Sequence, residues 1–166
     1  MTTKPALRSS GNFPDKAGLV AAASTATRSM SARSFFDTNV LVYADDKAAP
    51  AKQRRALAVI AEHRRLATGV VSLQVLQEYF VTATRKLKVD AAVARRKVEL
   101  LAEFDVAIPE VSDILAAIDL HRLHGFSFWD ALALRSVKQS GCSVFLSEDL
   151  QKQREVDGVR IVNPFA

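Results

Sequence analysis

The sequence predicts an α/β fold of three layers, α/β/α, in which helices cover both faces of a central parallel sheet of about five strands. From residue 34 onward, short apolar runs alternate with longer segments in which apolar side chains recur every three or four positions. The short runs are typical of buried strands, and the longer recurrence is typical of helices. Because strand and helix alternate along the chain, successive strands are expected to be parallel.

Five strands are expected in chain order, and each is a short apolar run that ends at a polar residue or a turn signal. They cover residues 34–37, 68–71, 105–108, 143–146 and 159–162. Helical recurrence follows the second and third strands. Its apolar positions are Leu73, Leu76, Phe80, Ala83 and Leu87 in one segment and Val111, Ile114, Leu115 and Ile118 in the other.

Capping residues and prolines predict where several helices begin. Ser72 and Ser127 stand directly before helical patterns, and serine is a preferred N-cap because its hydroxyl accepts a bond from a free amide. Pro50 and Pro109 stand at two further positions where a helix is expected to start. A helix is therefore expected between each pair of neighbouring strands up to the fourth.

Residues 34–166 are expected to form one domain, and residues 1–33 a disordered extension. The first 33 residues are rich in Ala, Ser and Thr and show no sustained periodicity. Met30, just before the first strand, also allows the natural start to lie there. Scattered Arg and Ser with few acids faintly resemble a transit peptide. We favour two other interpretations of residues 1–33, a disordered tail or a start that lies upstream of the natural one.

Composition indicates an ordinary soluble protein of a reducing compartment, the cytoplasm. Of the 166 residues 49% are hydrophobic and 25% are charged, and no apolar run approaches the length of a membrane span. The single cysteine, Cys142, lies in an apolar run and has no partner for an internal disulfide. We expect Cys142 to fill space in the core and no membrane to be involved.

The net charge of +5 would suggest a nucleic-acid partner, but its distribution weakens that inference. Residues 1–33 carry five basic side chains against one acid, and residues 34–166 carry 18 against 17. The basic residues of the domain are clustered, and such clusters bind phosphates or form solvated helix faces. Charge alone therefore leaves both readings open.

Four carboxylates stand in otherwise apolar runs, where an ionised side chain is costly to bury without compensation. They are Asp37, Glu78, Asp130 and Asp149. Asp37 and Asp149 follow the first and fourth strands, and ligands of parallel sheets bind beyond the carboxyl ends of strands. A divalent cation held through oxygen ligands is an economical compensation, which predicts Mg²⁺ or Mn²⁺ at this edge.

Each acid also has a structural reading. Asp37 and Asp149 could cap the helices that follow them, Glu78 could lie on a solvated helix face, and Asp130 fits a capping box with Ser127. Four such coincidences at the same edge of one sheet are hard to accept, so we favour a metal site. The neighbouring Trp129 could stack on a base but is expected to lie in the core.

Four segments containing these acids resemble the acidic motifs of PIN-domain nucleases, above all the VapC-type toxins of type II toxin–antitoxin pairs. The likeness spans residues 34–166, and its motifs are Asp37-Thr38-Asn39, Leu76-Gln77-Glu78-Tyr79, Ser127-Phe128-Trp129-Asp130-Ala131-Leu132 and Ser147-Glu148-Asp149-Leu150. The resemblance implies a PIN-like fold and metal-dependent hydrolysis of RNA phosphodiester bonds by an endoribonuclease. In that case the four acids are the catalytic, metal-binding residues, with Asp37 and Asp130 favoured as direct ligands and Glu78 and Asp149 bound directly or through waters. Thr38, Asn39 and Ser147 are candidates to orient them.

The resemblance also implies partners and leaves alternatives. A VapC-type toxin would act on RNA, would be inhibited by a small antitoxin protein, and would form a homodimer. An RNA-processing PIN nuclease without an antitoxin is one alternative, and an inert RNA- or protein-binding module is another. A phosphatase that uses Asp37 as its nucleophile is disfavoured, because such enzymes usually carry a second Asp where this chain has Asn39.

Overall fold

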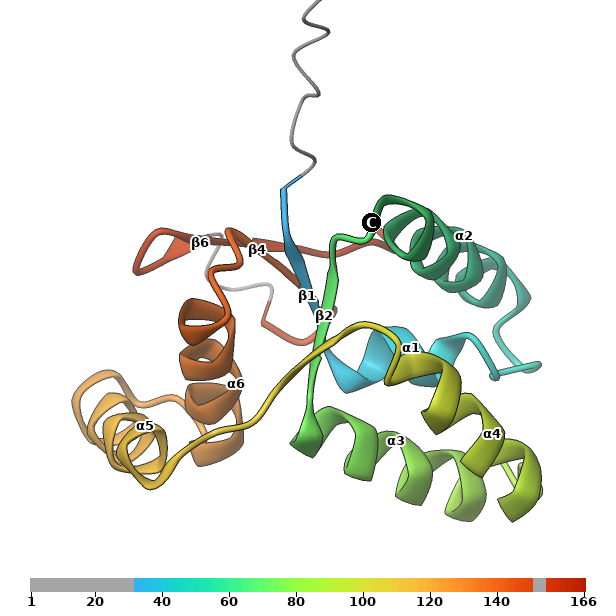
Figure 1. Cartoon of the computed structure of the whole chain (residues 1–166), viewed down its shortest axis with the longest axis horizontal. Coiled ribbons are helices and arrows are strands. Elements are labelled where there is room, and N and C mark those ends of the chain that lie inside the picture. Colours follow the sequence, from blue (N-terminus) through green and yellow to red (C-terminus); the bar gives the residue numbers. More distant parts are fainter. Residues whose placement is uncertain (1–31, 151–154) are drawn as a thin grey trace, which may run out of the picture.

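The computed structural model describes residues 32–150 and 155–166. All but the last two residues of the predicted extension 1–33 lie outside the described residues, so its expected disorder stays a prediction. In the described part the chain forms an α/β unit with helices on both sides of a sheet (Figure 1). The expected three-layer α/β/α fold is confirmed.

The sheet of the described part has six strands in the order β3-β2-β1-β4-β6-β5. All neighbouring strands are parallel except β5 and β6. At its centre Phe35 lies opposite Val70 on one side and Phe145 on the other. The strands are β1 (Ser34–Phe36), β2 (Gly69–Ser72), β3 (Asp105–Ala107), β4 (Val144–Leu146), β5 (Glu155–Val156) and β6 (Val159–Val162).

The five predicted strands are confirmed within one residue at either end, and β5 is the addition. It pairs with β6 across a two-residue turn at Asp157 and Gly158, which both have positive φ, 52° and 80°. Two positive φ values in succession suit a tight hairpin turn, for which Asp-Gly is a favoured sequence. The strand was missed because two residues, one of them Glu155, are too few to show a period.

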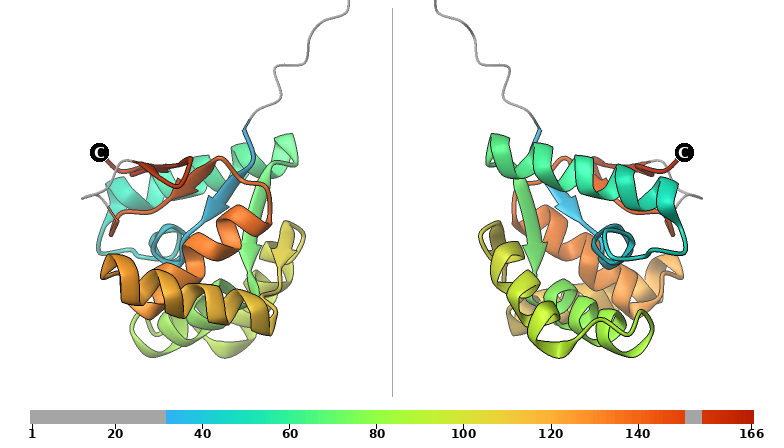
Figure 2. Two further views of the ribbon diagram at one scale, coloured as in Figure 1. Left: turned by 90° about the vertical axis from the view of Figure 1, so that its left-hand side faces the viewer. Right: turned by 90° about the vertical axis from the view of Figure 1, so that its right-hand side faces the viewer.

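Helices α1 to α4 lie on one side of the sheet, and α5 and α6 on the other (Figures 1 and 2). Right-handed crossovers require this division, since the strand order runs in one direction from β1 to β3 and then turns back to β4. The helices are α1 (Thr38–Tyr43), α2 (Pro50–Leu66), α3 (Leu73–Arg85), α4 (Ala91–Leu101), α5 (Val111–His124) and α6 (Phe128–Gln139).

Most of the predicted helix starts are confirmed. Pro50 is the first residue of α2, and the hydroxyls of Ser72 and Ser127 accept bonds from the amides of Val75 and Asp130 at 3.2 and 3.1 Å. The expected start at Pro109 is two residues early. Glu110 caps α5 there, and its own N–H donates to the Asp113 carboxylate at 3.0 Å.

The core lies along the central strands and contains the expected cysteine. Phe35 and Phe145 are almost fully buried, and their rings meet edge to face at 5.6 Å. Phe36 packs against the ring of Phe104 at 5.4 Å from the opposite face of β1. Cys142 is buried and free, as expected. The short strands β1 and β4 are thereby held side by side.

The two helices on the second face of the sheet, α5 and α6, expose several apolar side chains. The stripe on α5 is largely exposed, with Val111 at 72% and Leu115 at 58%, because the inner face of α5 is formed by Ala117 and by Asp113, which pairs with Arg135 of α6. Trp129, expected in the core, is 59% exposed. It lies in the first turn of α6, where the next residues, Ala131 and Leu132, take the buried positions instead.

Candidate functional site

The site begins where β1 and β4 end beside each other. The N–H of Asp37 donates to the carbonyl of Leu146 at 3.0 Å, which extends the pairing of the two strands by one residue. The N–H of Ser147 in turn donates to Val162 of β6 at 3.1 Å. Parallel pairing therefore fixes the backbone of Asp37 and Ser147 at the same carboxyl edge of the sheet.

The Asp37 carboxylate lies at the centre of a hydrogen-bond network. One oxygen, Oδ1, accepts from the Thr38 amide at 2.7 Å and so caps α1. The other, Oδ2, accepts from the Ser147 hydroxyl at 2.6 Å and from Nδ2 of Asn39 at 2.9 Å. The capping interpretation is therefore confirmed, but the cap uses one oxygen and leaves the second directed at other polar groups of the edge.

Asn39 links Asp37 to a second acid. The same Nδ2 that donates to Asp37 also donates to Oδ2 of Asp149 at 3.0 Å. The N–H of Asp149 donates to the hydroxyl of Ser147 at 3.2 Å, which orients the loop after β4. Two carboxylates that would otherwise repel each other are thus joined through one amide group.

Glu78 reaches the same edge from α3. The hydroxyl of Thr38 donates to its Oε2 at 2.6 Å, and Nε2 of Gln74 donates to its Oε1 at 2.7 Å. The hydroxyl of the next residue, Tyr79, donates to Asp45 at 2.6 Å, which fixes α3 against the end of α1. Gln74 was missed from the sequence, although its spacing of four residues from Glu78 on a helix is a recognisable signal.

No hydrogen bond among the described residues joins Asp130 to this network. Its Oδ2 accepts from the Ser127 hydroxyl at 2.7 Å, in the first turn of α6. The predicted capping box is therefore formed only in part, since the carboxylate binds the Ser127 hydroxyl instead of the Ser127 amide. Because α6 precedes β4 and runs back across it, Asp130 still lies toward the carboxyl edge.

The predicted site residues thus fall into two groups. Connected by hydrogen bonds at the carboxyl edge are three acids and the three predicted orienting residues: Asp37, Glu78, Asp149, Thr38, Asn39 and Ser147. Asp130 stands apart from that group. The expected convergence of acids holds in the structure for three of the four.

Crowding and burial perturb the central acid. Burial raises the pKa of the Asp37 carboxyl from 3.8 to about 6, and the nearby charges of Asp149 and Glu78 push it in the same direction. Hydrogen bonds from Ser147 and from the Thr38 amide oppose the shift. A carboxylate that is this costly to ionise would be stabilised by any cation that enters the cluster.

The donor set suits a hard divalent cation. Carboxylate and hydroxyl oxygens face one another across the network, and oxygen ligands are those that Mg²⁺ and Mn²⁺ prefer. Across residues 32–150 and 155–166, no three acidic, histidine or cysteine side chains stand close enough together to hold one ion. Mg²⁺ usually retains several waters, so one or two protein carboxylates suffice to anchor it.

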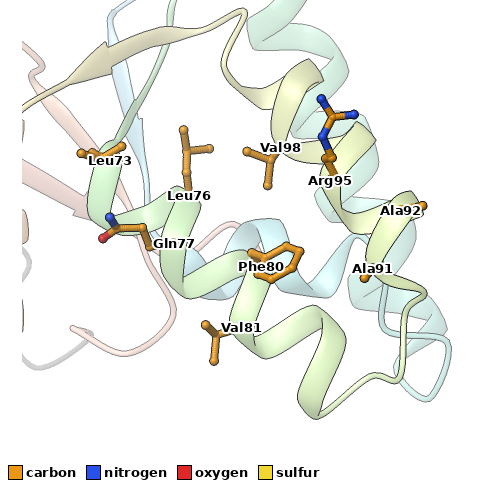
Figure 3. Close-up of a pocket in the computed structure, with 9 residues that line it drawn as sticks. All are labelled: Leu73, Leu76, Gln77, Phe80, Val81, Ala91, Ala92, Arg95 and Val98. Atoms are coloured by element: carbon orange, nitrogen blue, oxygen red, sulfur yellow. The ribbon is translucent and has the colours of Figure 1, made fainter.

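An apolar groove is lined by side chains of two neighbouring helices (Figure 3). It lies between α3 and α4 and has a volume of about 710 Å³. Gln77 and Val81 belong both to this groove and to a smaller cavity of about 310 Å³ at Thr38 and Glu78. The groove is lined by Leu73, Leu76, Gln77, Phe80, Val81, Ala91, Ala92, Arg95 and Val98. A partner that fills it would lie next to Glu78.

Comparison with protein families gives one match over most of the domain. The model of the PIN domain family matches residues 34–159. That range contains all four acids and every residue of the hydrogen-bond network. No curated protein sequence matches the chain significantly.

Solved structures share the fold. The structure of VapC20 from Mycobacterium tuberculosis, a toxin that cleaves the sarcin-ricin loop, is 22% identical and superposes with a TM-score of 0.61, covering 76% of this chain and 98% of VapC20. A toxin–antitoxin complex from Klebsiella pneumoniae gives a TM-score of 0.58 at 16% identity, covering 79% of this chain and 97% of the matched chain. At these identities the likeness establishes the shared fold.

The raised pKa of Asp37 predicts how the stability of the metal-free protein depends on pH. Because the folded-state pKa lies above the unfolded one, the native state binds more protons between pH 3.8 and about 6. Stability therefore falls as the pH rises through that window. Asp37→Asn removes the titration, so between pH 5 and pH 7 the wild type should lose about 1 kcal/mol relative to this variant. Urea unfolding of both proteins in EDTA measures the difference, and a difference that is constant with pH would contradict the burial of an ionisable Asp37.

Proposed function

Because the chain belongs to the PIN domain family, we propose that it is a metal-dependent endoribonuclease and the VapC-type toxin of a type II toxin–antitoxin pair. The observation that carries the proposal is the bridging of Asp37 and Asp149 by one Asn39 amide, with Glu78 attached through Thr38. An acid cluster alone would repel an anionic phosphodiester. With a cation bound, the same cluster becomes a site for hydrolysis.

The acids would hold Mg²⁺ or Mn²⁺. Asp37 and Asp149 are the proposed direct ligands, because Asn39 already holds them together. Asp130, which the sequence favoured as a direct ligand, binds Ser127 instead, so it and Glu78 complete the cluster directly or through waters. The bound ion supplies an activated water and neutralises charge on the phosphodiester. Water is then the nucleophile, so no side chain needs to form a covalent intermediate.

The remaining residues of the network would orient the acids. Asn39 and Ser147 fix Oδ2 of Asp37, and Thr38 and Gln74 each hold one oxygen of Glu78. Such partners of metal ligands limit the rotation of the carboxylate and keep it ready for the ion. Four of the five hydrogen bonds that the carboxylates of Asp37 and Glu78 accept are shorter than 2.8 Å, which indicates a tightly held site.

RNA is the proposed substrate. Trp129, exposed directly beside Asp130, offers a surface on which a base could stack. Exposed arginines on α2 and α4 could bind phosphates. An RNA-processing nuclease without an antitoxin would use the same site, so it is the alternative within enzymes. The presence of all four acids argues against an inert binding module.

An antitoxin is the proposed protein partner, and the groove between α3 and α4 is the surface we assign to it. An apolar segment of the antitoxin would lie along the groove, and a cationic side chain would reach the acids and displace the metal. A homodimer is proposed from the family likeness. The exposed apolar stripe of α5 around Val111 and Leu115 is a surface that dimer formation would bury.

Residues 34–166 are the proposed catalytic unit, and the cytoplasm its proposed location. The buried, unpaired thiol of Cys142 suits a reducing compartment. In the described part of the chain, no helix is both long and apolar enough to cross a membrane.

Cleavage of RNA should depend on a divalent metal and on the acids. The purified protein should cleave RNA in Mg²⁺ or Mn²⁺ and stop in excess EDTA. Asp37→Asn or Asp130→Asn should lower the rate at least about 100-fold, since losing even an outer partner of a metal ligand costs up to that much. Asp119→Asn, on the exposed face of α5, makes the same change away from the site and should leave the rate unchanged. Full activity after chelation would rule out the metal mechanism.

Removal of residues 1–33 should preserve folding and metal-dependent cleavage, because every acid of the network lies downstream. Affinity for RNA should fall at low salt, since the truncation deletes five basic residues and one acid. Arg33 pairs with Asp105, so a second truncation that keeps residues 32 and 33 separates that contact from the rest. An unfolded protein in both truncations would show that the extension belongs to the domain.

Co-expression of the adjacent gene should relieve any growth arrest caused by this chain, and the two proteins should co-purify. Val81→Asp places a charge in the groove and should weaken the complex at least about tenfold, because an apolar contact becomes an unpaired buried charge. Val93→Asp is the matched control, since Val93 is exposed to the same degree, 48% against 45%, but does not line the groove. If the active protein is harmless and no neighbour binds it, the RNA-processing alternative replaces the toxin.

A further inference from the structure

Lys52, in the first turn of α2, reaches across to the loop after β4. Its Nζ donates to Oε1 of Glu148 at 2.5 Å and to the hydroxyl of Tyr43 at 3.0 Å. Glu148 stands between Ser147 and Asp149, the two residues of this loop that belong to the acid network. The Lys52–Glu148 pair is half-buried, so solvent screens it less than a pair on an open surface.

The ammonium group of Lys52 rests on aromatic rings. It lies 4.4 Å from the ring centroid of Tyr43 and 5.7 Å from that of Phe165. The two rings meet edge to face at 4.9 Å, so they form a continuous apolar support for a cation. Arg55 adds a second link from α2 to the same C-terminal segment by donating to the carbonyl of Pro164 at 2.9 Å. The position of Lys52 is therefore fixed by elements outside the acid network.

The Lys52–Glu148 pair also keeps the Glu148 carboxylate away from the acid network. With its carboxylate held by Lys52, Glu148 keeps only its backbone N–H directed at the network, toward Oδ1 of Asn39 at 3.4 Å. On one side of Glu148, the Ser147 hydroxyl donates to Asp37. On the other side, Asp149 accepts from Asn39, which also binds Asp37. Holding Glu148 against α2 thus leaves its two neighbours to face Asp37.

We infer that Lys52 is a positioning residue for the metal centre: by binding Glu148 it holds the loop from which Ser147 and Asp149 reach Asp37. Among the described residues Lys52 donates hydrogen bonds to Glu148 and the Tyr43 hydroxyl and to no acid of the network, so it acts on the network through Glu148. The inference rests on the proposed function, because the position of the loop affects metal affinity only if the acids bind a metal.

Electrostatics and positioning predict opposite changes in metal affinity when Lys52 is removed. Removing a cation from the neighbourhood of an acid cluster raises the affinity for a second cation, if charge alone acts. Loosening the loop that carries Asp149 lowers that affinity, because the ligand must then be ordered at the moment of binding. The sign of the change therefore separates the two effects.

The test is a titration of the full chain with Mn²⁺, followed by electron paramagnetic resonance of the free ion. Lys52→Met keeps the length of the side chain and should weaken Mn²⁺ binding roughly tenfold, the lower end for losing an outer partner of a ligand. Lys52→Arg retains a cation that can bind Glu148 and should restore most of the affinity. Lys47→Met removes the same charge from an exposed position and should bind Mn²⁺ as the wild type does. Unfolding temperatures confirm that each variant is folded.

A double-mutant cycle tests whether Lys52 acts through Glu148. Glu148→Ala should weaken binding, and adding Lys52→Met to it should cause no further loss, since the contact is already gone. Additive losses would overturn the inference. Unchanged or tighter Mn²⁺ binding in Lys52→Met would also overturn it. If that variant only raised KM for RNA, Lys52 would instead contact a phosphate of the substrate, and the inference would fail.

A measurement without metal keeps the inference separate from the proposed function. In EDTA, hydrogen exchange of the Glu148 and Asp149 amides should be at least about tenfold faster in Lys52→Met than in the wild type, because the loop opens more often. If the wild type binds no Mn²⁺ while exchange is accelerated, the metal site fails and the positioning of the loop stands. Exchange that is equal in the two proteins would overturn the positioning of the loop itself.

Discussion

The bridging of two carboxylates by the Asn39 side chain is the contact on which the site depends. Its single amide group lies 2.9 Å from Asp37 and 3.0 Å from Asp149, so two like charges are held near each other in the absence of a cation. Burial and this repulsion raise the pKa of Asp37 to about 6. The folded chain therefore carries an unfavourable arrangement of charge that a divalent ion would relieve.

The rest of the fold serves to maintain that arrangement. Parallel pairing of β1 and β4 places Asp37 and Ser147 side by side, and packing of Phe35 against Phe145 in the core holds the two strands together. On the helical side, the contact of Tyr79 with Asp45 fixes α3 so that Glu78 reaches Thr38. The acids come from distant parts of the sequence, so they meet only when the sheet is formed. The Tyr79–Asp45 contact alone could not bring them together.

The sequence predicted those features that have a period or a strong local signal. Alternating apolar runs and caps such as Ser72 located five strands and most helix starts, and acids in apolar runs identified the network at the edge of the sheet. The two-residue strand β5 was missed because it is too short to show a period. The exposure of Trp129 and the separation of Asp130 from the other acids depend on how α6 packs, which residue spacing does not reveal.

Anomalous diffraction from a crystal soaked in Mn²⁺ locates the bound ion without reference to activity. We expect a manganese peak within direct coordination distance, about 2.2 Å, of carboxylate oxygens of Asp37 and Asp149. The ion would replace the shared Asn39 amide as the group that joins them. A crystal that shows Asp37 and Asp149 still bridged by Asn39, with no manganese at either carboxylate, would contradict this expectation.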